Sequence, residues 1–208
     1  MERATIKEFK DKSNIEIIQE LMKMNNGYIT TKQLSDFGIH RMYLNIMKEK
    51  KTIEKVGCGI YIDYKKIEDN YYVFSLRMPN IVFSHITALY FHGLSIKAPS
   101  KEYDITVCNN YFNNNIKNHN VFYVSKNIYN LGLSKIKTPM GNEVKAYDIE
   151  RCICDIIRSR KRMDIEHVKY SIKEYLKRKD KDLVKLSEYA KKMGIEKDVI
   201  EFVSMFYD

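Results

Sequence analysis

The sequence predicts an α+β protein with an N-terminal winged helix-turn-helix, a small antiparallel sheet and a C-terminal group of helices. Three observations support this prediction. Short segments with apolar residues at helical spacing lead into a glycine-containing hairpin, alternating segments typical of strands fill the middle, and amphipathic helices fill the last third. The 208 residues suit one large domain or two small ones, and we expect two, at residues 1–66 and 67–208.

The first helix is expected at residues 14–24, where Ile and Leu recur at helical spacing. Ser13 or Asn14 can accept a hydrogen bond from the free N–H groups at its start. Gly27 and the two asparagines before it tolerate a left-handed backbone, so the helix should end there.

The helix-turn-helix follows. Thr30 or Thr31 caps a second short helix, and Gly38 allows a sharp turn into a third helix that opens near His40. Residues 53–63 are expected to form a hairpin whose tip contains two glycines.

The rest of the chain is expected to hold strands followed by helices. Residues 69–83 are ambiguous and include Pro79. Ser84 can cap a helix that Gly93 ends. Strands are expected at residues 103–108, 121–124, 133–137 and 143–146, and helices at residues 148–160, 165–178, 183–193 and 197–207.

The third helix carries polar side chains suited to reading DNA. The turn at Gly38 makes its start protrude, as insertion into a major groove requires. Arg41 can form two hydrogen bonds with guanine and Asn45 two with adenine, while lysines and a helix start bind phosphates. The candidate DNA-binding residues are Thr31, Lys32, His40, Arg41, Asn45, Lys48, Lys51 and Lys55. The alternative is that this small helical domain is a protein-binding adaptor.

The net charge of +9 and the pI of about 9.2 favour a polyanionic partner, nucleic acid before acidic lipid. Residues 1–66 hold thirteen Lys and Arg against nine Asp and Glu, and residues 97–145 hold seven against three. A second basic surface would comprise Lys135, Lys137, Arg158, Arg160, Lys161 and Arg162. Scattered, solvated charges are the alternative for this second set.

Several function classes lack their sequence signatures. No stretch is apolar and long enough to span a membrane, and the charged N-terminus has no apolar run like that of a signal peptide, so we expect a cytoplasmic protein. The four cysteines lack CxxC spacing, which favours reduced thiols over a metal site. We find no phosphate-binding loop or catalytic motif, and we therefore expect no cofactor and no enzymatic activity.

Two further patterns have weak functional interpretations. His85 and His92 are seven residues apart and share a helix face, but a metal needs a third ligand, so a core or capping role is favoured. Glu102 and Asp104, near Lys101, offer a faint version of the carboxylate and lysine cluster of a metal-dependent nuclease. A DNA-targeted nuclease therefore remains an alternative function.

Two stretches resemble a known family. They are GYITTKQLSDFGIHRMYLNIMKEKKTIEKVGCGIYI (residues 27–62) and FSHITALYFHGLS (residues 83–95), the latter followed by strands and AYDIERCICDIIR (residues 146–158). Together they resemble the AbiEi antitoxins of type IV toxin–antitoxin systems, which act in bacterial abortive infection and phage defence. The first stretch is shared by many winged-helix proteins, whereas the second is the more specific.

The resemblance implies a transcriptional autorepressor that binds inverted repeats in its own promoter. It also implies a C-terminal antitoxin domain that counters a nucleotidyltransferase-like toxin without forming a stable complex. Wings of the family often carry Arg or Lys where this chain has Cys58, which leaves more of the expected wing contact to Lys55.

Overall fold

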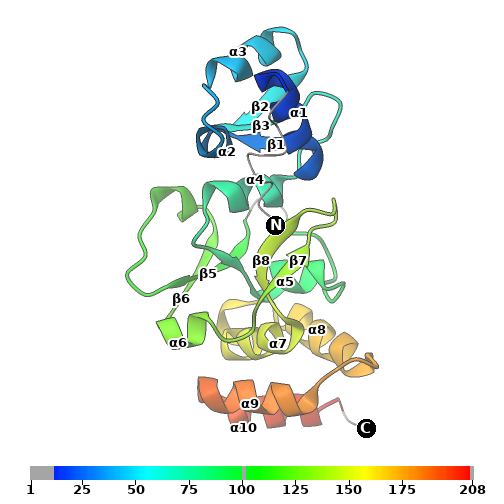
Figure 1. The fold of residues 1–208 in the computed structure, drawn as a ribbon. Helices are drawn as coiled ribbons and strands as arrows, with labels where there is room; N and C mark the ends of the chain where they lie inside the picture. Colours follow the sequence, from blue (N-terminus) through cyan, green and yellow to red (C-terminus); the bar gives the residue numbers. More distant parts are fainter. Residues whose placement is uncertain (1–11, 100–101, 207–208) are drawn as a thin grey trace. The chain divides into compact units, whose positions relative to one another are not determined.

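The computed structural model describes residues 12–99 and 102–206 and divides the chain into two compact units, Met1–Pro79 and Asn80–Asp208 (Figure 1). We call them unit 1 and unit 2. Both contain helices and a sheet, which confirms the α+β class.

Unit 1 combines helices with a three-stranded antiparallel sheet of order β1-β3-β2. Ser13 and Thr30 each accept a hydrogen bond from the third backbone N–H of a helix, and Glu16 and Gln33 bond back to the N–H groups of the two caps. These capping boxes fix where α1 and α2 begin. The elements are α1 (Asn14–Met24), β1 (Tyr28–Thr30), α2 (Thr31–Asp36), α3 (Met42–Glu49), β2 (Ile53–Gly57), β3 (Ile60–Asp63) and α4 (Asn70–Arg77).

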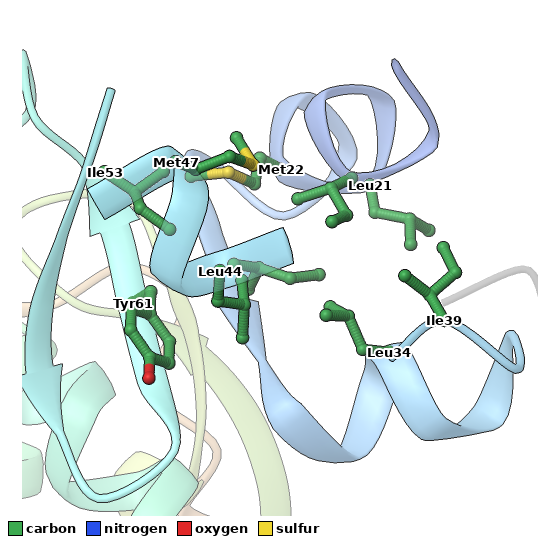
Figure 2. Packing of buried hydrophobic residues seen from close by; sticks show 10 residues of the cluster. Leu21, Met22, Leu34, Ile39, Leu44, Met47, Ile53 and Tyr61 are labelled. Carbon is green, nitrogen blue, oxygen red and sulfur yellow. The ribbon is translucent and has the colours of Figure 1, made fainter. Parts of the chain in front are cut away.

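Strand β3 is apolar on both faces. Tyr61 packs into the cluster formed with α1, α2 and α3 (Figure 2), whereas Ile60 and Ile62 join Tyr28 and Val73 in a second cluster. Successive side chains of a strand point to opposite faces of the sheet, so the two clusters lie on opposite sides of it. The sheet is therefore buried between the three N-terminal helices and α4.

Helix α4 corrects the expected boundary between residues 66 and 67. Asp69 caps this helix by accepting hydrogen bonds from the backbone N–H groups of Tyr71 and Tyr72, and its own N–H donates to the Tyr28 hydroxyl at 2.7 Å. The Tyr28 and Tyr72 rings meet edge to face at 4.9 Å. One core thus continues past Asp63, and the units divide after Pro79.

Unit 2 contains a five-stranded sheet of order β6-β5-β4-β8-β7. Pairs α7–α8 and α9–α10 lie in successive layers beyond the sheet (Figure 1). The elements are β4 (Val82–Phe83), α5 (His85–Phe91), β5 (Asp104–Cys108), η2 (Asn114–Ile116), β6 (Asn120–Val124), α6 (Lys126–Tyr129), β7 (Leu133–Lys137), β8 (Glu143–Tyr147), α7 (Ile149–Arg158), η3 (Arg160–Arg162), α8 (Ile165–Lys177), α9 (Leu183–Met193) and α10 (Glu196–Ser204).

This sheet is mixed, which corrects the expectation of a purely antiparallel one. Strands β5 and β6 run parallel, as do β4 and β8, and only the β4–β5 and β7–β8 pairs are antiparallel. The long connection between Cys108 and Asn120, which includes η2, returns the chain to the end of the sheet at which β5 begins. Strand β6 therefore runs in the same direction as β5.

Helix α7 lies at the centre of unit 2 and buries charge as well as apolar side chains. Arg151 and Asp155 are both fully buried and form an ion pair with Nε and Oδ2 3.0 Å apart. Arg151 Nη1 also donates to the backbone carbonyls of Ile128 and Leu131, and Arg158 reaches the second Asp155 oxygen at 3.3 Å. Through Arg151, the polar side of this amphipathic helix is therefore hydrogen-bonded to the segment before β7 inside unit 2.

The first prediction concerns the extent of unit 1. Residues 1–66 expressed alone should be less stable than residues 1–79 by about 3 kcal/mol, because Tyr28, Ile60 and Ile62 lose the apolar cover of Tyr72 and Val73. Urea denaturation followed by circular dichroism measures the difference. Equal unfolding midpoints for the two fragments would contradict the assignment of α4 to unit 1.

The second prediction concerns the buried ion pair. In the full chain, Asp155→Ala should cost about 3–5 kcal/mol, because it leaves the Arg151 guanidinium buried without its counterion. Asp180→Ala is the matched control, since it removes the exposed Arg178–Asp180 pair, worth at most about 1 kcal/mol. The free energies of unfolding in urea decide between them. A similar cost for both variants would show that the buried pair stabilises no more than an exposed one.

Candidate nucleic-acid interface

The inner face of the helix pair α2–α3 is fixed by the core. Leu34, Ile39, Leu44 and Met47 are buried in the cluster of Figure 2. Gly38 adopts a φ of 68°, in the left-handed region that glycine enters without strain, and so reverses the chain between the helices. The opposite face of α3 is consequently left open to solvent.

The outer face of α3 carries three of the predicted DNA-binding side chains. Arg41, Asn45 and Lys48 are all exposed. Their spacing of four and three residues places them on one side of the helix. Arg41 is the cap residue and already has helical backbone angles, so it extends this row by one turn.

His40 does not lie on the helix, which corrects the expectation that it shares the polar face. Helix α3 begins at Met42, and the His40 Nδ1 atom accepts a hydrogen bond from the Met42 backbone N–H at 3.2 Å. No serine, threonine or aspartate stands at this helix start. The ring is therefore engaged in satisfying the first turn of α3.

A hollow of about 430 Å³ lies between the start of α2 and the start of α3. Its charged and titratable side chains are Lys32, His40 and Arg41, and no acidic side chain lines it. A concave, positively charged surface of this kind suits a phosphate group. The hollow thus adjoins the Arg41 end of the exposed row on α3.

The hairpin tip is attached to the start of α2. The Thr31 backbone N–H donates to the Gly59 carbonyl at 2.9 Å, and a side chain at Gly59 would strike the Thr31 hydroxyl. The Thr31 N–H is therefore engaged and does not offer itself to phosphate, contrary to expectation. Cys58 at the tip is exposed.

The remaining predicted phosphate contacts are exposed lysines. Lys32 extends from the second residue of α2, Lys51 follows α3 with a left-handed φ of 53°, and Lys55 lies on β2 opposite Tyr61. These lysines share unit 1 with the row on α3, as all eight predicted DNA-binding residues do.

The second basic set is separated by the sheet of unit 2. Lys135 and Lys137 lie on edge strand β7, whereas the Arg162 guanidinium stands 4.8 Å from the ring of Phe122 on the opposite edge strand, β6. Four strand spacings of about 4.8 Å separate these edges. The expected continuous basic surface is therefore not formed.

Two arginines of this second set already have carboxylate partners. Arg158 pairs with Asp155 at 3.3 Å and Arg160 pairs with Asp198 at 2.8 Å. Lys161 and Arg162 are exposed. The Arg158–Arg162 segment thus stabilises unit 2 at least in part through its own charges.

The nuclease alternative gains no cluster from the described residues. Asp104 is buried, Glu102 is exposed, and Lys101 lies outside the described residues. Within residues 12–99 and 102–206, no three His, Cys, Asp or Glu side chains are grouped so that they could hold a metal ion.

His85 and His92 have structural partners in unit 2. His85 is fully buried, and its ring nitrogens lie 2.9 Å from the Ser84 hydroxyl and 3.1 Å from the Ser159 hydroxyl. His92 caps the end of α5, and its Nε2 donates to the Tyr147 carbonyl at 2.9 Å. Sequence spacing placed both on one helix, but it missed that His85 has a left-handed φ of 45° and stacks on Phe122 at 3.5 Å.

Comparison with known proteins leaves the family open. No protein-family model and no curated protein matches the chain. Among solved structures, the chain is similar to the RV2827C protein from Mycobacterium tuberculosis, with a TM-score of 0.46 and 11% sequence identity over 92% of this chain and 80% of that one. No helix among the described residues is long and apolar enough to cross a membrane.

The third prediction is a pH dependence that arises from His85. Burial, with a smaller effect of the nearby Arg158, lowers the pKa of His85 well below its usual 6.5. The unfolded chain therefore binds a proton near pH 6.5 that the folded chain does not bind. The free energy of unfolding should be highest above that pH and fall below it, by up to about 1.4 kcal/mol per pH unit for this residue.

His85→Asn provides the comparison, because asparagine tolerates the left-handed backbone and has no proton to gain. The variant should be less stable at neutral pH but lose less stability between neutral pH and pH 5. Urea unfolding over this pH series measures both slopes. Identical slopes for the variant and the unchanged protein would remove His85 as the source.

Proposed function

We propose that unit 1 is a winged helix-turn-helix that binds double-stranded DNA. The observation that carries the proposal is the exposed row Arg41, Asn45 and Lys48 on one side of α3, whose other side is buried. A side chain can read a base edge only when it stands on a rigid element that enters the groove. Core packing by Leu44 and Met47 supplies this rigidity.

Within this proposal, α3 lies in the major groove. The guanidinium of Arg41 and the amide of Asn45 have the donor and acceptor geometry to recognise guanine and adenine, respectively. Lys32, Lys51 and Lys55 neutralise phosphates beside the groove and fix the register of the helix. His40 supports the start of α3, so its contribution to binding is through helix position.

We further propose that the protein represses its own promoter through inverted repeats and acts as the antitoxin of a type IV toxin–antitoxin system. Support for this part comes from the resemblance of residues 27–62, 83–95 and 146–158 to AbiEi antitoxins. Unit 2, with its own core, is the proposed antitoxin domain, and the partner is a nucleotidyltransferase-like toxin that forms no stable complex with it. In this proposal the protein is cytoplasmic and not an enzyme.

The neighbouring gene tests the antitoxin part. Its product should resemble a nucleotidyltransferase, should arrest growth when expressed alone, and should be tolerated when the full chain is co-expressed. A toxic neighbour that the full chain fails to neutralise would contradict the proposal, without bearing on DNA binding.

The fourth prediction separates base reading from phosphate binding on DNA taken from upstream of the gene. Arg41→Ala should weaken binding to this DNA by about 1–3 kcal/mol and have little effect on unrelated DNA of the same length. Fluorescence anisotropy titrations of the full chain measure both affinities. Equal losses on the two DNAs would exclude base reading by Arg41.

Lys55→Ala should weaken binding to both DNAs alike and reduce the slope of log K against log salt by about 0.9. Lys65→Ala is the matched control, because this exposed lysine lies at the base of the hairpin, after β3. A change in slope for Lys65→Ala but not for Lys55→Ala would contradict the placement of the hairpin on DNA. No binding to either DNA at low salt would instead favour a protein-binding adaptor.

A further inference from the structure

Unit 2 contains a cavity that the proposed DNA-binding function does not use. Its volume is about 380 Å³, within the range of small-molecule sites. The start of α5, strands β5 and β6, and the segment that leads from η3 into α8 all contribute to its wall. Three polar groups of this wall carry hydrogen-bonding capacity that their protein partners leave unused.

Arg162 is the first of these groups. Arg158 and Arg160 have carboxylate partners, whereas Arg162 forms no ion pair with any residue that the structure describes. Its guanidinium instead stands 4.8 Å from the centre of the Phe122 ring. The contact with the ring orients the guanidinium, and its five N–H donors remain available to a ligand.

Asp104 is the second group, and it is 7% exposed. One carboxylate oxygen accepts from the Ile86 backbone N–H at 3.0 Å, and the other accepts from Asn120 Nδ2 at 2.9 Å. The Thr87 backbone N–H also hydrogen-bonds to this carboxylate, which leaves one of its four lone pairs for a ligand. Burial raises the pKa of Asp104, while the hydrogen bonds from Asn120, Ile86 and Thr87 and the nearby Arg162 oppose this shift.

His167 is the third group. The Ile96 backbone N–H donates to its Nε2 at 3.2 Å, so the proton of the neutral ring is on Nδ1. Burial lowers the pKa of His167, which favours this neutral form. Within the described part of the chain, Nδ1 is neither sealed from solvent nor bonded to an acceptor, and it can donate to a ligand.

We propose that this cavity binds a small zwitterion of the α-amino-acid class, with its carboxylate on Arg162 and its ammonium on Asp104. Such a ligand can contact both the unpaired guanidinium and the buried carboxylate, because the two groups line one cavity. The Nδ1–H of His167 is a further donor for the ligand carboxylate. Both charges of the ligand then meet a charge of opposite sign.

The charge balance of the wall favours a zwitterion over a phosphate ester. Two cations, Lys97 and Arg162, are accompanied by three acids, Glu102, Asp104 and Asp164. A site for a doubly charged anion would require an excess of positive charge. The excess of one acid therefore disfavours a doubly charged anion, and the unpaired Arg162 among these acids favours a ligand with one charge of each sign over a simple cation.

The fifth prediction tests the ligand class by isothermal titration calorimetry of the full chain with each of the proteinogenic amino acids. At least one should bind, and the amine and the carboxylic acid that each lack one of its two charged groups should bind about tenfold or more weakly. Failure of all amino acids to bind would overturn the proposal. Equal binding of the carboxylic acid or of inorganic phosphate would also overturn it, because the site would then be an anion site.

Matched variants locate the site. Arg162→Gln should weaken binding of the same amino acid about tenfold to a hundredfold, whereas Lys161→Gln, which removes the same charge from the adjacent exposed residue outside the cavity, should leave binding unchanged. Asp104→Asn should weaken binding by a similar factor. Thermal unfolding measures whether each variant is folded. If Asp104→Asn does not fold, Arg162→Gln alone still tests the proposal.

Equal weakening by Arg162→Gln and Lys161→Gln would place the ligand elsewhere and overturn the assignment. Affinity of the same variants for DNA is measured in parallel. Because the cavity belongs to unit 2 alone, loss of amino-acid binding with unchanged DNA binding separates the outcome of this proposal from that of the DNA-binding proposal.

Discussion

Unit 1 depends on the burial of strand β3 from both sides. The alternation Ile60, Tyr61, Ile62 sends one side chain toward α1–α3 and two toward α4. A shift of one residue in the pairing with β1 or β2 would exchange these two sets, so that Tyr61 would face Val73 of α4. The register of three residues thus fixes the sheet, and through the core it fixes the exposed face of α3.

Much of unit 1 could be predicted because its controlling interactions are local. The capping boxes at Ser13 and Thr30, the glycine turn at Gly38 and the hairpin are each encoded within a few residues. Helix α4 escaped prediction because its tyrosine, valine and phenylalanine residues have modest helix propensity. Its stability comes from contact with Tyr28, more than forty residues earlier, which no local pattern reveals.

Unit 2 shows where sequence reasoning stops. Strand β4 has two residues, too few for any alternation, yet it joins the two halves of the sheet and decides that the sheet is mixed. Arg151 and Asp155 have the spacing of a solvent-exposed helical ion pair. Their burial is compatible with charge because two carbonyls, of Ile128 in α6 and of Leu131 in the turn after it, replace water around the guanidinium. The sequence likewise predicts one basic surface that includes Lys135, Lys137 and Arg162. The strand order instead places the two lysines and the arginine at opposite edges of the sheet.

The interior of unit 2 contains buried polar side chains near the cavity. Ser84, His85 and Thr106 are fully buried and joined by hydrogen bonds of 2.9 Å, and His85 adopts a backbone conformation that side chains disfavour. Burial of polar groups costs free energy unless every group is hydrogen-bonded, and an apolar core would avoid this cost.

His85 also stacks on Phe122, the ring beside which Arg162 stands. Its Nε2 contacts Ser159, whose backbone carbonyl accepts from the Arg162 N–H at 2.8 Å. The buried histidine therefore fixes both the ring and the turn that together position the unpaired guanidinium. The strained backbone of His85 and its buried hydrogen bonds therefore support the position of Arg162, the arginine of the cluster that is available to a ligand.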